Sequence, residues 1–349
     1  MSVLCFDGFD EYTTENDLWD YGNWYDSLGT TFSNSTALRL GSSGKYARVT
    51  GRLTYKLPND SFDGAIYMGA AIFISALPAS DGRIVSFDRT FSANIANEHA
   101  SIGVTTTGEL YVNDQAGVQT LTGTSIVVDT WYSLEVKFVR GAAGTIDIKL
   151  DGTLIYSFSG DTENGVDLTN SYINFISTGY VPVSTTSEIE PLLVDDFYCF
   201  DALGTLSNTW GGNLFVESLP PASDSSVAFT PLSGTNFSNI DEGLINDGDT
   251  TYVESSTIGH RDLYANSAPT QPVLSVKGVK VFSASKSADA GAINLKIGVK
   301  AGVDEAQSAA NAVTASYANY EQYFDSKDGG TTEFVTADLD ALLTVIEVG

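Results

Sequence analysis

The chain has 349 residues, 42% of them hydrophobic, and its 44 acidic residues outnumber 17 basic ones, for a formal net charge of -27 at pH 7. This length exceeds what one hydrophobic core usually supports, so we expect two domains. The hydrophobic content is that of a folded protein, so we do not expect a disordered chain. The acidic excess leaves no basic patch for nucleic-acid phosphates and disfavours anionic membranes, so we expect neither a nucleic-acid partner nor membrane insertion.

The N-terminal stretch MSVLCFDGFDEY lacks a basic segment followed by an apolar one, so we predict no secretory signal. The longest apolar run, residues 65–77, is too short to cross a bilayer as a helix and is interpreted as a buried strand. Only two cysteines occur, Cys5 in the first strand candidate and Cys199 in the last one of the N-terminal half. This number excludes a disulfide-stapled scaffold and a cysteine zinc site, and leaves two buried thiols or one bridge as alternatives.

Short apolar or alternating segments recur from the N-terminus to about residue 202, separated by clusters of Gly, Asn, Asp and Ser. No long amphipathic helix interrupts them, so we expect an antiparallel β-sandwich. The predicted strands cover residues 3–7, 46–56, 65–77, 83–88, 100–105, 108–113, 171–177 and 192–200, together with a three-stranded meander in 131–160.

The meander, WYSLEVKFVRGAAGTIDIKLDGTLIYSFSG, is the clearest structural signal in the chain. Apolar and polar residues alternate in each of its three segments, which predicts strands with one buried face. Trp131 begins the first of them and is expected in the core. Asp151 and Gly152 separate the second and third, and they favour a type I′ hairpin because both central residues of that turn need positive φ.

The pattern breaks after Ala202, where Gly and Pro pairs punctuate the sequence, so we place a domain boundary near residue 204. The predicted domains are therefore residues 1–203 and 204–349. Alternating apolar positions in the second domain predict further strands in VAFTPL, TTYVES, PVLSVKGVKVFSAS and AINLKIGVKAG. The fold class that follows is all-β, with a sandwich followed by a second, smaller β-sandwich domain.

Residues 304–318 are alanine-rich, which suits a helix, but their apolar positions form no helical stripe. We favour a loop followed by a strand. Near the end, Thr336 is expected to cap a short helix over residues 338–343, with Asp338 near the positive end of its dipole. The final VIEV then forms a closing strand.

The N-terminal 200 residues resemble the concanavalin A-like lectin/glucanase (laminin-G-like) family. The features that carry this resemblance are the opening VLCFDGFDEY, the central WYSLEV followed by IKLDG, and the closing VDDFY. The resemblance implies a jelly-roll sandwich in which the last strand returns beside the first. The family includes lectins, enzymes and structural domains, so the resemblance specifies a fold more closely than a function.

The C-terminal part is similar to modules of tailed-bacteriophage virion proteins that follow a laminin-G-like domain. The similarity is carried by GGNLFVESLPPASDSSVAFTPLSG, NIDEGLINDGDTTYVESSTIGHRDLY, residues 317–324 and FVTADLDALLTVIEVG. It implies a noncatalytic protein on the virion exterior, either capsid decoration (cement) or a tail-associated fibre component, assembled in the host cytoplasm. The expected partners are other virion proteins (major capsid or tail proteins) and further copies of the chain, with weak adhesion to host surface polysaccharide.

We predict no enzymatic activity, and so no catalytic residues. Retaining glucanases of this fold carry E-x-D-x-x-E or E-x-D-x-E on one strand, and neither pattern occurs. The nearest carboxylates are Asp195 and Asp196, expected on opposite strand faces, and Glu188 with Glu190 in a polar loop. The two histidines, His99 and His260, are far from any nucleophile in the sequence, and GSSGK has the wrong spacing for a phosphate loop.

The one cofactor considered is a structural Ca²⁺. The resemblance implies that such an ion lies between the terminal strands, with Asp7, Asp195 and Asp196 as its ligands, since hard cations take carboxylate oxygens. The turn Asn246-Asp247-Gly248-Asp249 is a second candidate, although it lacks the distal glutamate of an EF-hand loop. At both places the alternative is a set of solvated turn carboxylates.

Sugar recognition needs exposed aromatic faces beside planar polar groups, and the stretch LWDYGNWYDS is the best candidate. Its aromatic residues are Trp19, Tyr21, Trp24 and Tyr25. The alternative is that they pack in the core or between subunits. If they bind glycans, the protein is a carbohydrate-binding adhesin or lectin. A third hypothesis is a polysaccharide-degrading glycosidase.

Overall fold

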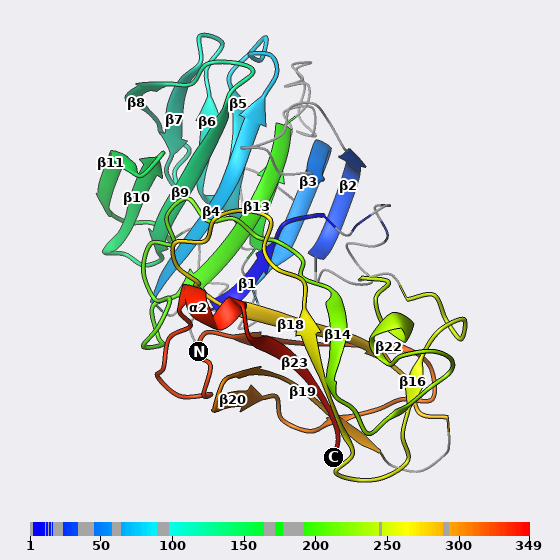
Figure 1. The fold of residues 1–349 in the computed structure, drawn as a ribbon. Helices are drawn as coiled ribbons and strands as arrows, with labels where there is room; N and C mark the ends of the chain where they lie inside the picture. The colour runs from blue at the N-terminus through cyan, green and yellow to red at the C-terminus, as the bar shows by residue number, and fades with distance from the viewer. Residues whose placement is uncertain are drawn as a thin grey trace. The chain divides into compact units, whose positions relative to one another are not determined.

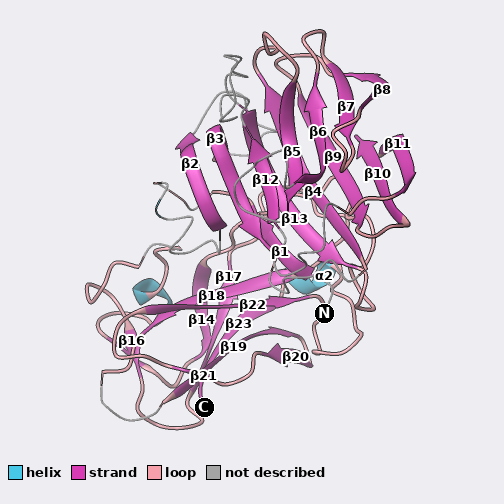
Figure 2. Ribbon diagram, turned by 180° about the vertical axis from the view of Figure 1, so that it is seen from behind, coloured by secondary structure: helices cyan, strands magenta, loops and turns pink. Residues whose placement is uncertain are grey.

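The computed structural model describes residues 3–10, 12, 14, 16, 24–33, 45–57, 64–88, 98–163, 172–176, 192–243, 246–288 and 293–349, with backbone alone at 25–29, 31–33, 50, 51, 174 and 176. The chain forms two compact units. Leu4–Leu203 and Asn208–Val216 make up the N-terminal domain, while Gly204–Ser207 and Glu217–Gly349 form the body of the C-terminal domain. Strands dominate both (Figure 2).

The N-terminal domain is built from antiparallel strands, which Figure 1 shows side by side. They are β1 (Val3–Asp7), β2 (Trp24–Ser33), β3 (Tyr46–Lys56), β4 (Ala65–Ile74), β5 (Gly82–Asp88), β6 (Glu98–Val104), β7 (Glu109–Asn113), β8 (Gln119–Ser125), β9 (Trp131–Val139), β10 (Gly144–Leu150), β11 (Thr153–Gly160), β12 (Tyr172–Ile176) and β13 (Leu192–Asp201). Their order across the sheet is β11-β10-β9-β4-β13-β3-β12-β5-β6-β7-β8, with β1 beside β13 and β2 beside β3.

This long sheet folds over into two layers, and β3 joins them. The first half of β3 pairs with β13, and its second half, from Arg52, pairs with β12. The layers meet through buried aromatic rings: Phe87 of β5 stacks on Phe138 of β9, with ring centroids 4.8 Å apart. The predicted all-β sandwich is confirmed, because alternate residues of each layer supply one apolar core.

The predicted strands match the structure closely, and 46–56 has the same bounds as β3. Two strands lie outside the predictions, β2 and β8. The sequence of β8, QTLTGTS, has few apolar residues because it is an exposed edge strand. The hairpin between β10 and β11 forms at Asp151 and Gly152, whose φ angles of 49° and 77° are those of the expected turn.

Both cysteines are buried and are not joined in a disulfide. Cys5 lies on β1 and Cys199 on β13, which are neighbouring strands. Burial raises the pKa of the Cys199 thiol. Of the two alternatives for these residues, the structure has the buried thiols.

A short segment that follows the sandwich, Asn208–Val216, packs back onto the N-terminal domain, and we call it the strap. It covers Tyr198 of β13, whose hydroxyl donates a hydrogen bond of 2.7 Å to the buried Glu135. The same carboxylate accepts the backbone N–H of Gly212 in the strap, at 2.8 Å. The ring of Tyr198 lies between two glycines, Gly69 of β4 and Gly211 of the strap, because neither carries a Cβ that would occupy its space.

We therefore expect Gly69→Ala to destabilise the N-terminal domain by at least about 1–3 kcal/mol, the usual cost of overpacking a core. The added Cβ would lie 2.2 Å from a ring carbon of Tyr198, and Glu135 holds the ring in place. Urea unfolding followed by circular dichroism measures the loss. In a Tyr198→Leu background the same substitution should cost much less; equal costs in both backgrounds would show that the ring is not the cause.

The C-terminal domain centres on a sheet in the order β14-β17-β23-β19-β20, with β21 also beside β19. A ribbon of β18 and β22 and a small pair, β15 and β16, complete it. The elements are β14 (Pro221–Ser226), β15 (Thr230–Pro231), η2 (Phe237–Asn239), β16 (Val253–Glu254), β17 (Arg261–Asn266), β18 (Val279–Ser285), β19 (Asn294–Ala301), β20 (Asp304–Gln307), β21 (Asn311–Ala312), β22 (Ala318–Phe324), α2 (Thr336–Leu339) and β23 (Leu342–Val348).

Residues 304–318 begin with a strand, β20, where we predicted a loop, because Asp304 follows a tight turn and pairs directly with Ala301 of β19. The predicted closing strand forms as β23, in the middle of the sheet. The predicted helix is shorter than expected and begins earlier, at Thr336. Its cap is Val335, and the carboxylate of Asp338 accepts the Val335 backbone N–H at 2.8 Å, so the expected cap at Thr336 is wrong.

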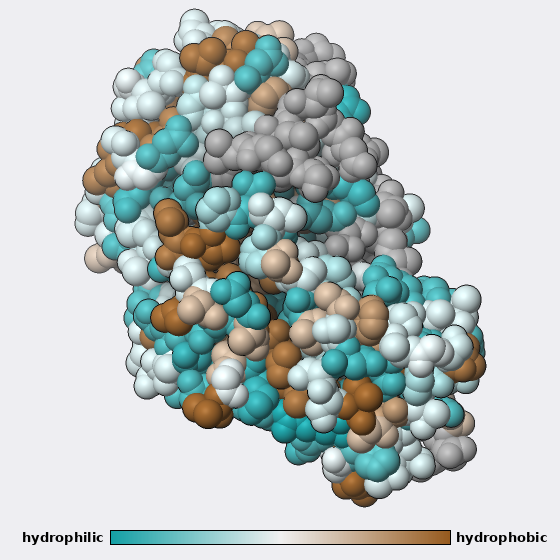
Figure 3. All heavy atoms as spheres, viewed as in Figure 1, coloured by the Kyte–Doolittle hydropathy of each residue, from teal (hydrophilic) through white to brown (hydrophobic). Residues whose placement is uncertain are grey.

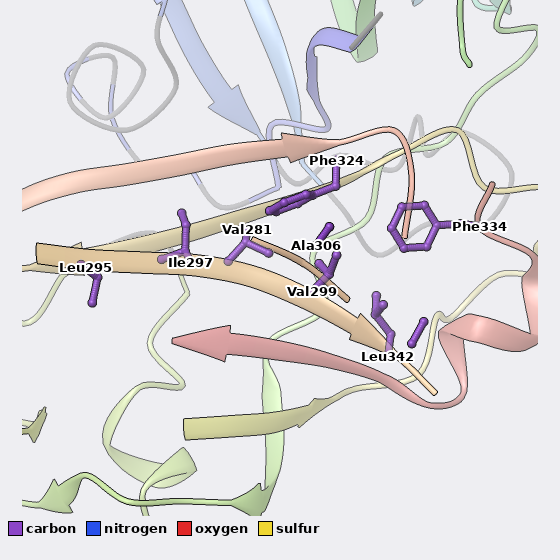
Figure 4. Close-up of a cluster of buried hydrophobic side chains, with 9 residues drawn as sticks. Val281, Leu295, Ile297, Val299, Ala306, Phe324, Phe334 and Leu342 are labelled. Atoms are coloured by element: carbon purple, nitrogen blue, oxygen red, sulfur yellow. The ribbon is translucent and has the colours of Figure 1, made fainter. Parts of the chain in front are cut away.

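The hydrophobic core of the C-terminal domain lies between β18, β19, β20, β22 and the segment before α2 (Figure 4). Its buried members are Val281, Leu295, Ile297, Val299, Ala301, Ala306, Phe324, Phe334 and Leu342. A separate buried network centres on Asp262 of β17, which has no exposed surface. Its carboxylate accepts hydrogen bonds from two backbone amides and two side chains, so one acid organises the loops around β17.

The surface carries hydrophilic residues with hydrophobic ones in several separate groups, as the face drawn in Figure 3 shows. No helix within the described ranges is long and apolar enough to cross a membrane.

Candidate functional site

A row of polar residues crosses the N-terminal sheet at a single register position. Its members are direct partners on neighbouring strands, one from each of β2, β3, β12, β5, β6, β7 and β8. In that order they are Asp26, Thr54, Asn174, Ser86, Ser101, Asn113 and Gln119, which we call the central row. Neighbouring strands lie about 4.8 Å apart, so six intervals give a row roughly 29 Å long.

Two further rows flank the central row on the same face of the sheet. One contains Lys56, Tyr172, Asp88 and Glu98, and the other contains Arg83, Gly103, Tyr111 and Leu121. Side-chain contacts join the rows, because Ser86 donates a hydrogen bond of 2.6 Å to Asp88. We call the three rows together the polar face.

The opposite face of the same strands is apolar. The residues that alternate with the polar ones are buried in the core of the sandwich; they include Val85, Phe87, Ala100, Ile102 and Val112. This alternation follows from the two-residue repeat of a β-strand. The polar residues therefore lie on the face of the sheet that points away from the core.

The polar face is buried in its middle and open at one end. Thr54, Ser86 and Ser101 have no exposed surface, whereas Asn113 is half-buried and Gln119 is exposed. The amide of Asn113 donates to the Ser101 hydroxyl at 3.3 Å, so the open end is joined to the buried middle. Solvent therefore reaches the central row at its β8 end.

An ion pair lies among these rows. The guanidinium of Arg83 is 2.9 Å from the carboxylate of Glu98, and both side chains are at least nine-tenths buried. Burial raises the pKa of Glu98, and the opposite charge of Arg83 and a hydrogen bond from Ser101 act against that rise. A carboxyl group with a raised pKa, next to a cation and hydroxyl groups, is typical of binding and catalytic sites.

Tyr111 lies beside this ion pair on β7. Its register partner is Gly103 of β6, and a Cβ on that glycine would lie 2.2 Å from the tyrosine ring, so the ring covers the glycine. Burial raises the pKa of Tyr111, against the nearby charge of Arg83. The hydroxyl therefore stays protonated and can donate a hydrogen bond at neutral pH.

The chemistry of the polar face suits a polyhydroxylated ligand. Amide, hydroxyl, carboxylate and guanidinium groups donate and accept hydrogen bonds in fixed directions, and they recur along the row at the spacing of the strands. Only the β8 end of the central row, with Asn113 and Gln119, meets solvent, so a ligand would contact the face there. The open end thus suits part of a polyhydroxylated polymer.

Of the aromatic residues predicted to bind glycans, Trp19 and Tyr21 lie outside the described residues, and Tyr25 is described in its backbone alone. Trp24 is 4% exposed and packs between Tyr55 and Phe197, so the packing alternative holds for it. The predicted core position of Trp131 is partly right: it is half-buried, against Tyr46, Phe73 and Leu193.

The residues predicted to bind Ca²⁺ are held by protein donors. Asp7 accepts the Phe9 backbone N–H, the Tyr12 hydroxyl at 2.6 Å and the Trp24 indole N–H at 2.9 Å. Asp196 accepts the Val216 backbone N–H at 2.8 Å.

Asp195 and Asp196 lie at a bulge in β13, where Asp196 has a φ of 49°, so the expected regular alternation of this pair is wrong. Among the residues described, no three His, Cys, Asp or Glu side chains are grouped to hold a metal. Calcium at Asp7, Asp195 and Asp196 stays a prediction.

The second calcium candidate is a turn packed against a lysine and a tyrosine. Asp249 forms an ion pair with Lys286, and Tyr317 donates a hydrogen bond to the Gly248 carbonyl at 2.8 Å. Hydrogen bonds from Lys286 and from the Tyr317 hydroxyl to its carboxylate lower the pKa of Asp249. Glu188, Glu190 and most of GSSGK fall outside the described part of the chain. His99 is buried, and His260 shares a hydrogen bond with Ser255.

Sequence reasoning missed the polar face. The strands that carry it were predictable from their apolar positions, and each one alone shows polar residues at every second position. Such residues usually face solvent, so the pattern suggested no site. The signal lies in the pairing: Ser86, Ser101 and Asn113 become a row only when the register between β5, β6 and β7 is known.

Comparison with family models found no match, and comparison with curated proteins found none either. Among solved structures, an endo-β-1,4-glucuronan lyase from the fungus Trichoderma reesei is similar at 12% identity and a TM-score of 0.39, over 57% of this chain and 95% of the lyase. A carbohydrate esterase from the Shiga toxin-encoding bacteriophage phi24B is similar at 14% identity and a TM-score of 0.40, over 57% of this chain and 98% of the esterase.

A sialidase from Trypanosoma rangeli is similar at 10% identity and a TM-score of 0.39, over 56% of this chain but only 30% of the sialidase. At such identities the similarity concerns the β fold alone.

These structures correct one prediction made from the sequence. We inferred a protein without enzymatic activity from its resemblance to noncatalytic virion components, but the three similar structures are a lyase, an esterase and a sialidase. A β-sandwich accommodates catalytic and binding sites alike on its strands and loops. The fold therefore gives no ground for excluding catalysis, and the prediction of a protein that is not an enzyme is wrong.

Proposed function

We propose that this chain is a protein of the exterior of a tailed-phage particle, and that its N-terminal domain binds host surface polysaccharide at the open end of the polar face. The observation that carries the proposal is the central row, in which polar residues of neighbouring strands stand in register. The similarity of the C-terminal sequence to virion modules supports the location on the particle. Partner virion proteins and self-association belong to the same proposal.

The acidic composition agrees with this role. A net charge of -27 keeps a protein soluble and opposes nonspecific association when many copies are present on one particle. Polysaccharide recognition through hydroxyl and amide groups does not depend on opposite charge, so it remains effective on such a surface.

We expect Asn113→Leu and Gln119→Leu, at the open end of the central row, to weaken polysaccharide binding by about tenfold or more when combined, since each lost hydrogen bond costs roughly 0.5–1.5 kcal/mol. Binding is measured by affinity electrophoresis in gels that contain capsular or cell-wall polysaccharide of the host. Thr120→Val is the matched control, because Thr120 follows Gln119 on β8, pairs with Val112 of β7 and faces the other way.

Binding that is unchanged in the double variant would contradict the proposal for the polar face. The location on the particle is tested separately, by antibody labelling of purified virions. Hundreds of copies per particle would place the protein on the capsid, and a few dozen or fewer would place it on the tail.

A second candidate function is cleavage of the polysaccharide, and one observation favours it. Asp88 and Glu98 are direct register partners on β5 and β6. A register shift precedes this pair, so the spacing of a regular pair does not apply to it; what the pair supplies is two carboxyl groups on neighbouring strands, the kind of set that retaining glycosidases use. Glu98, with its raised pKa, would donate a proton to the leaving oxygen while Asp88 attacks the anomeric carbon.

In that mechanism water then hydrolyses the glycosyl ester on Asp88, and Glu98 recovers its proton from the water. Release of reducing ends from the polysaccharide measures the reaction. Activity should fall by at least a hundredfold in Asp88→Asn, in line with the usual contribution of a positioned catalytic group. Polysaccharide that is bound and not cleaved would leave binding as the function.

A further inference from the structure

A pocket lies within the C-terminal domain, far from the polar face in sequence. It opens where β20 and β22 end, and the turn after β22 closes one side. Its polar wall includes Gln307, Ser308, Gln322, Tyr323 and Asp325. Its volume is about 330 Å³, within the range of pockets that hold small molecules.

The floor of the pocket is part of the hydrophobic core. Ala306 and Phe324 line it, and both belong to the buried cluster drawn in Figure 4, where they lie on separate strands. Ala306 is fixed by pairing with Val299 of β19, and Phe324 by pairing with Val279 of β18. The floor is therefore held by strand pairing on both sides and does not need a ligand in order to form.

The wall includes an amide that the protein orients. It is not the amide of Gln307, whose Nε2 donates to Glu305 at 2.8 Å and to Glu347 at 3.1 Å on the face of β20 opposite to Ala306. The Gln322 Nε2 donates to the Tyr323 carbonyl at 2.9 Å. Side chains fixed in this way lose little conformational entropy when a ligand binds.

The turn that closes the pocket is also fixed. The Asp328 carboxylate accepts the backbone N–H groups of Gly330 and Thr332, at 2.8 and 3.2 Å. Gly329 has a φ of 68°, which favours glycine, and a Cβ there would meet Ala306 at 3.8 Å. Glycine at this position therefore serves the left-handed backbone of the turn, since the contact with Ala306 would be an ordinary one.

The charges around the pocket exclude an anionic ligand. Lys327, the lysine of the closing turn, is held by Asp338 at 3.1 Å and by Asp304 at 3.5 Å. Asp325 contributes a carboxylate to the wall. The described residues offer no set of three acids or histidines for a metal ion. Amides, a carboxylate and an aromatic side chain on an apolar floor are instead suited to a neutral molecule rich in hydroxyl groups.

We propose that this pocket is a second carbohydrate site, which takes one neutral sugar residue, and that it acts independently of the polar face. Asp325 and Gln322 present planar acceptors and donors to neighbouring hydroxyls of the sugar. The apolar floor, formed by Ala306 and Phe324, contacts its carbon-bound hydrogens. The chain would then hold a polymer through one domain and a single terminal sugar through the other.

The test uses the full chain and saturation-transfer NMR with glucose, galactose, mannose and N-acetylglucosamine, each at millimolar concentration. We expect a signal from at least one of them. Gln322→Leu keeps the size of the side chain and removes the amide, and Asp325→Asn removes the charge; both should weaken the signal at least several-fold. Thr120→Val, which belongs to neither site, is the matched control and should leave the signal unchanged.

The proposal is overturned if none of the four sugars gives a signal, or if Gln322→Leu and Asp325→Asn both leave the signal unchanged. It is also overturned if Asn113→Leu alone removes the signal, because the sugar would then lie on the polar face. If the polar-face variants lose polysaccharide binding and keep the monosaccharide signal, the two sites are independent, as proposed. The melting temperature of each variant shows whether it is folded.

Discussion

An Arg83→Met variant should lose about 3–5 kcal/mol of the free energy of unfolding of the N-terminal domain, the usual cost of removing one partner from a buried ion pair. Methionine fills much of the space of the arginine stem but leaves the Glu98 carboxylate without its cation. The side chains of Arg83 and Glu98 are 9% and 3% exposed, so water cannot replace the lost charge.

The loss should grow with pH. Without Arg83, burial acts on Glu98 with less opposition and its pKa rises further above the ordinary value of 4.5. Between the ordinary and the raised pKa, the native state holds a proton that the unfolded chain has released, so stability falls as pH increases. The variant should therefore be closest to the wild type below pH 4.5 and furthest from it at neutral pH.

Urea unfolding at several pH values measures both effects. The double variant Arg83→Met with Glu98→Gln is the control, since it removes the buried charge together with its partner. It should recover most of the stability and show a weaker dependence on pH. A single variant as stable as the wild type at neutral pH would mean that Glu98 is not charged in the folded protein.

Replacing Asp262 with alanine should destabilise the C-terminal domain by more than about 3 kcal/mol, because each buried donor left without an acceptor costs roughly 1–3 kcal/mol. Asp262 accepts the backbone amides of Ala228 and Phe229, at 2.6 and 2.9 Å. It also accepts the Asn236 amide at 2.8 Å and the Tyr264 hydroxyl.

Thermal unfolding followed by circular dichroism measures this loss. The matched control is Asp328→Ala, another carboxylate that accepts two backbone amides but lies in an exposed turn. Water replaces the lost contacts there, so the control should cost far less. If the two variants lower stability equally, the burial of Asp262 does not determine its importance.

Much of the fold was predictable because apolar and polar residues alternate along each strand, and this pattern is visible in the local sequence. Residues 46–56 carry enough β-branched and aromatic residues to be found with the bounds they have in the structure, and the Asp151 and Gly152 turn has the one backbone geometry its residues favour. The strand β8 was not predicted, because an exposed edge strand buries few side chains and its sequence need not be apolar.

The candidate site could not be predicted in the same way, because it depends on contacts between distant parts of the chain. Thr54 and Ser86 reach the same row only through β12, which lies much later in the sequence and pairs with both of their strands. Arg83 meets Glu98 across a bulge whose position no local pattern reveals. The helix cap failed for a smaller reason, since a carboxylate three residues on served in place of the expected hydroxyl.

The strap limits where recombination between genes can separate the two domains. The chain leaves the N-terminal domain at Leu203, contributes Gly204–Ser207 to the other domain, and returns with Asn208–Val216 before leaving again. Recombination that exchanged one half at residue 203 would separate Tyr198 and Glu135 from Gly211 and Gly212. A viable exchange has to take place after Val216, so related genes that share only the first domain should join their new partner there.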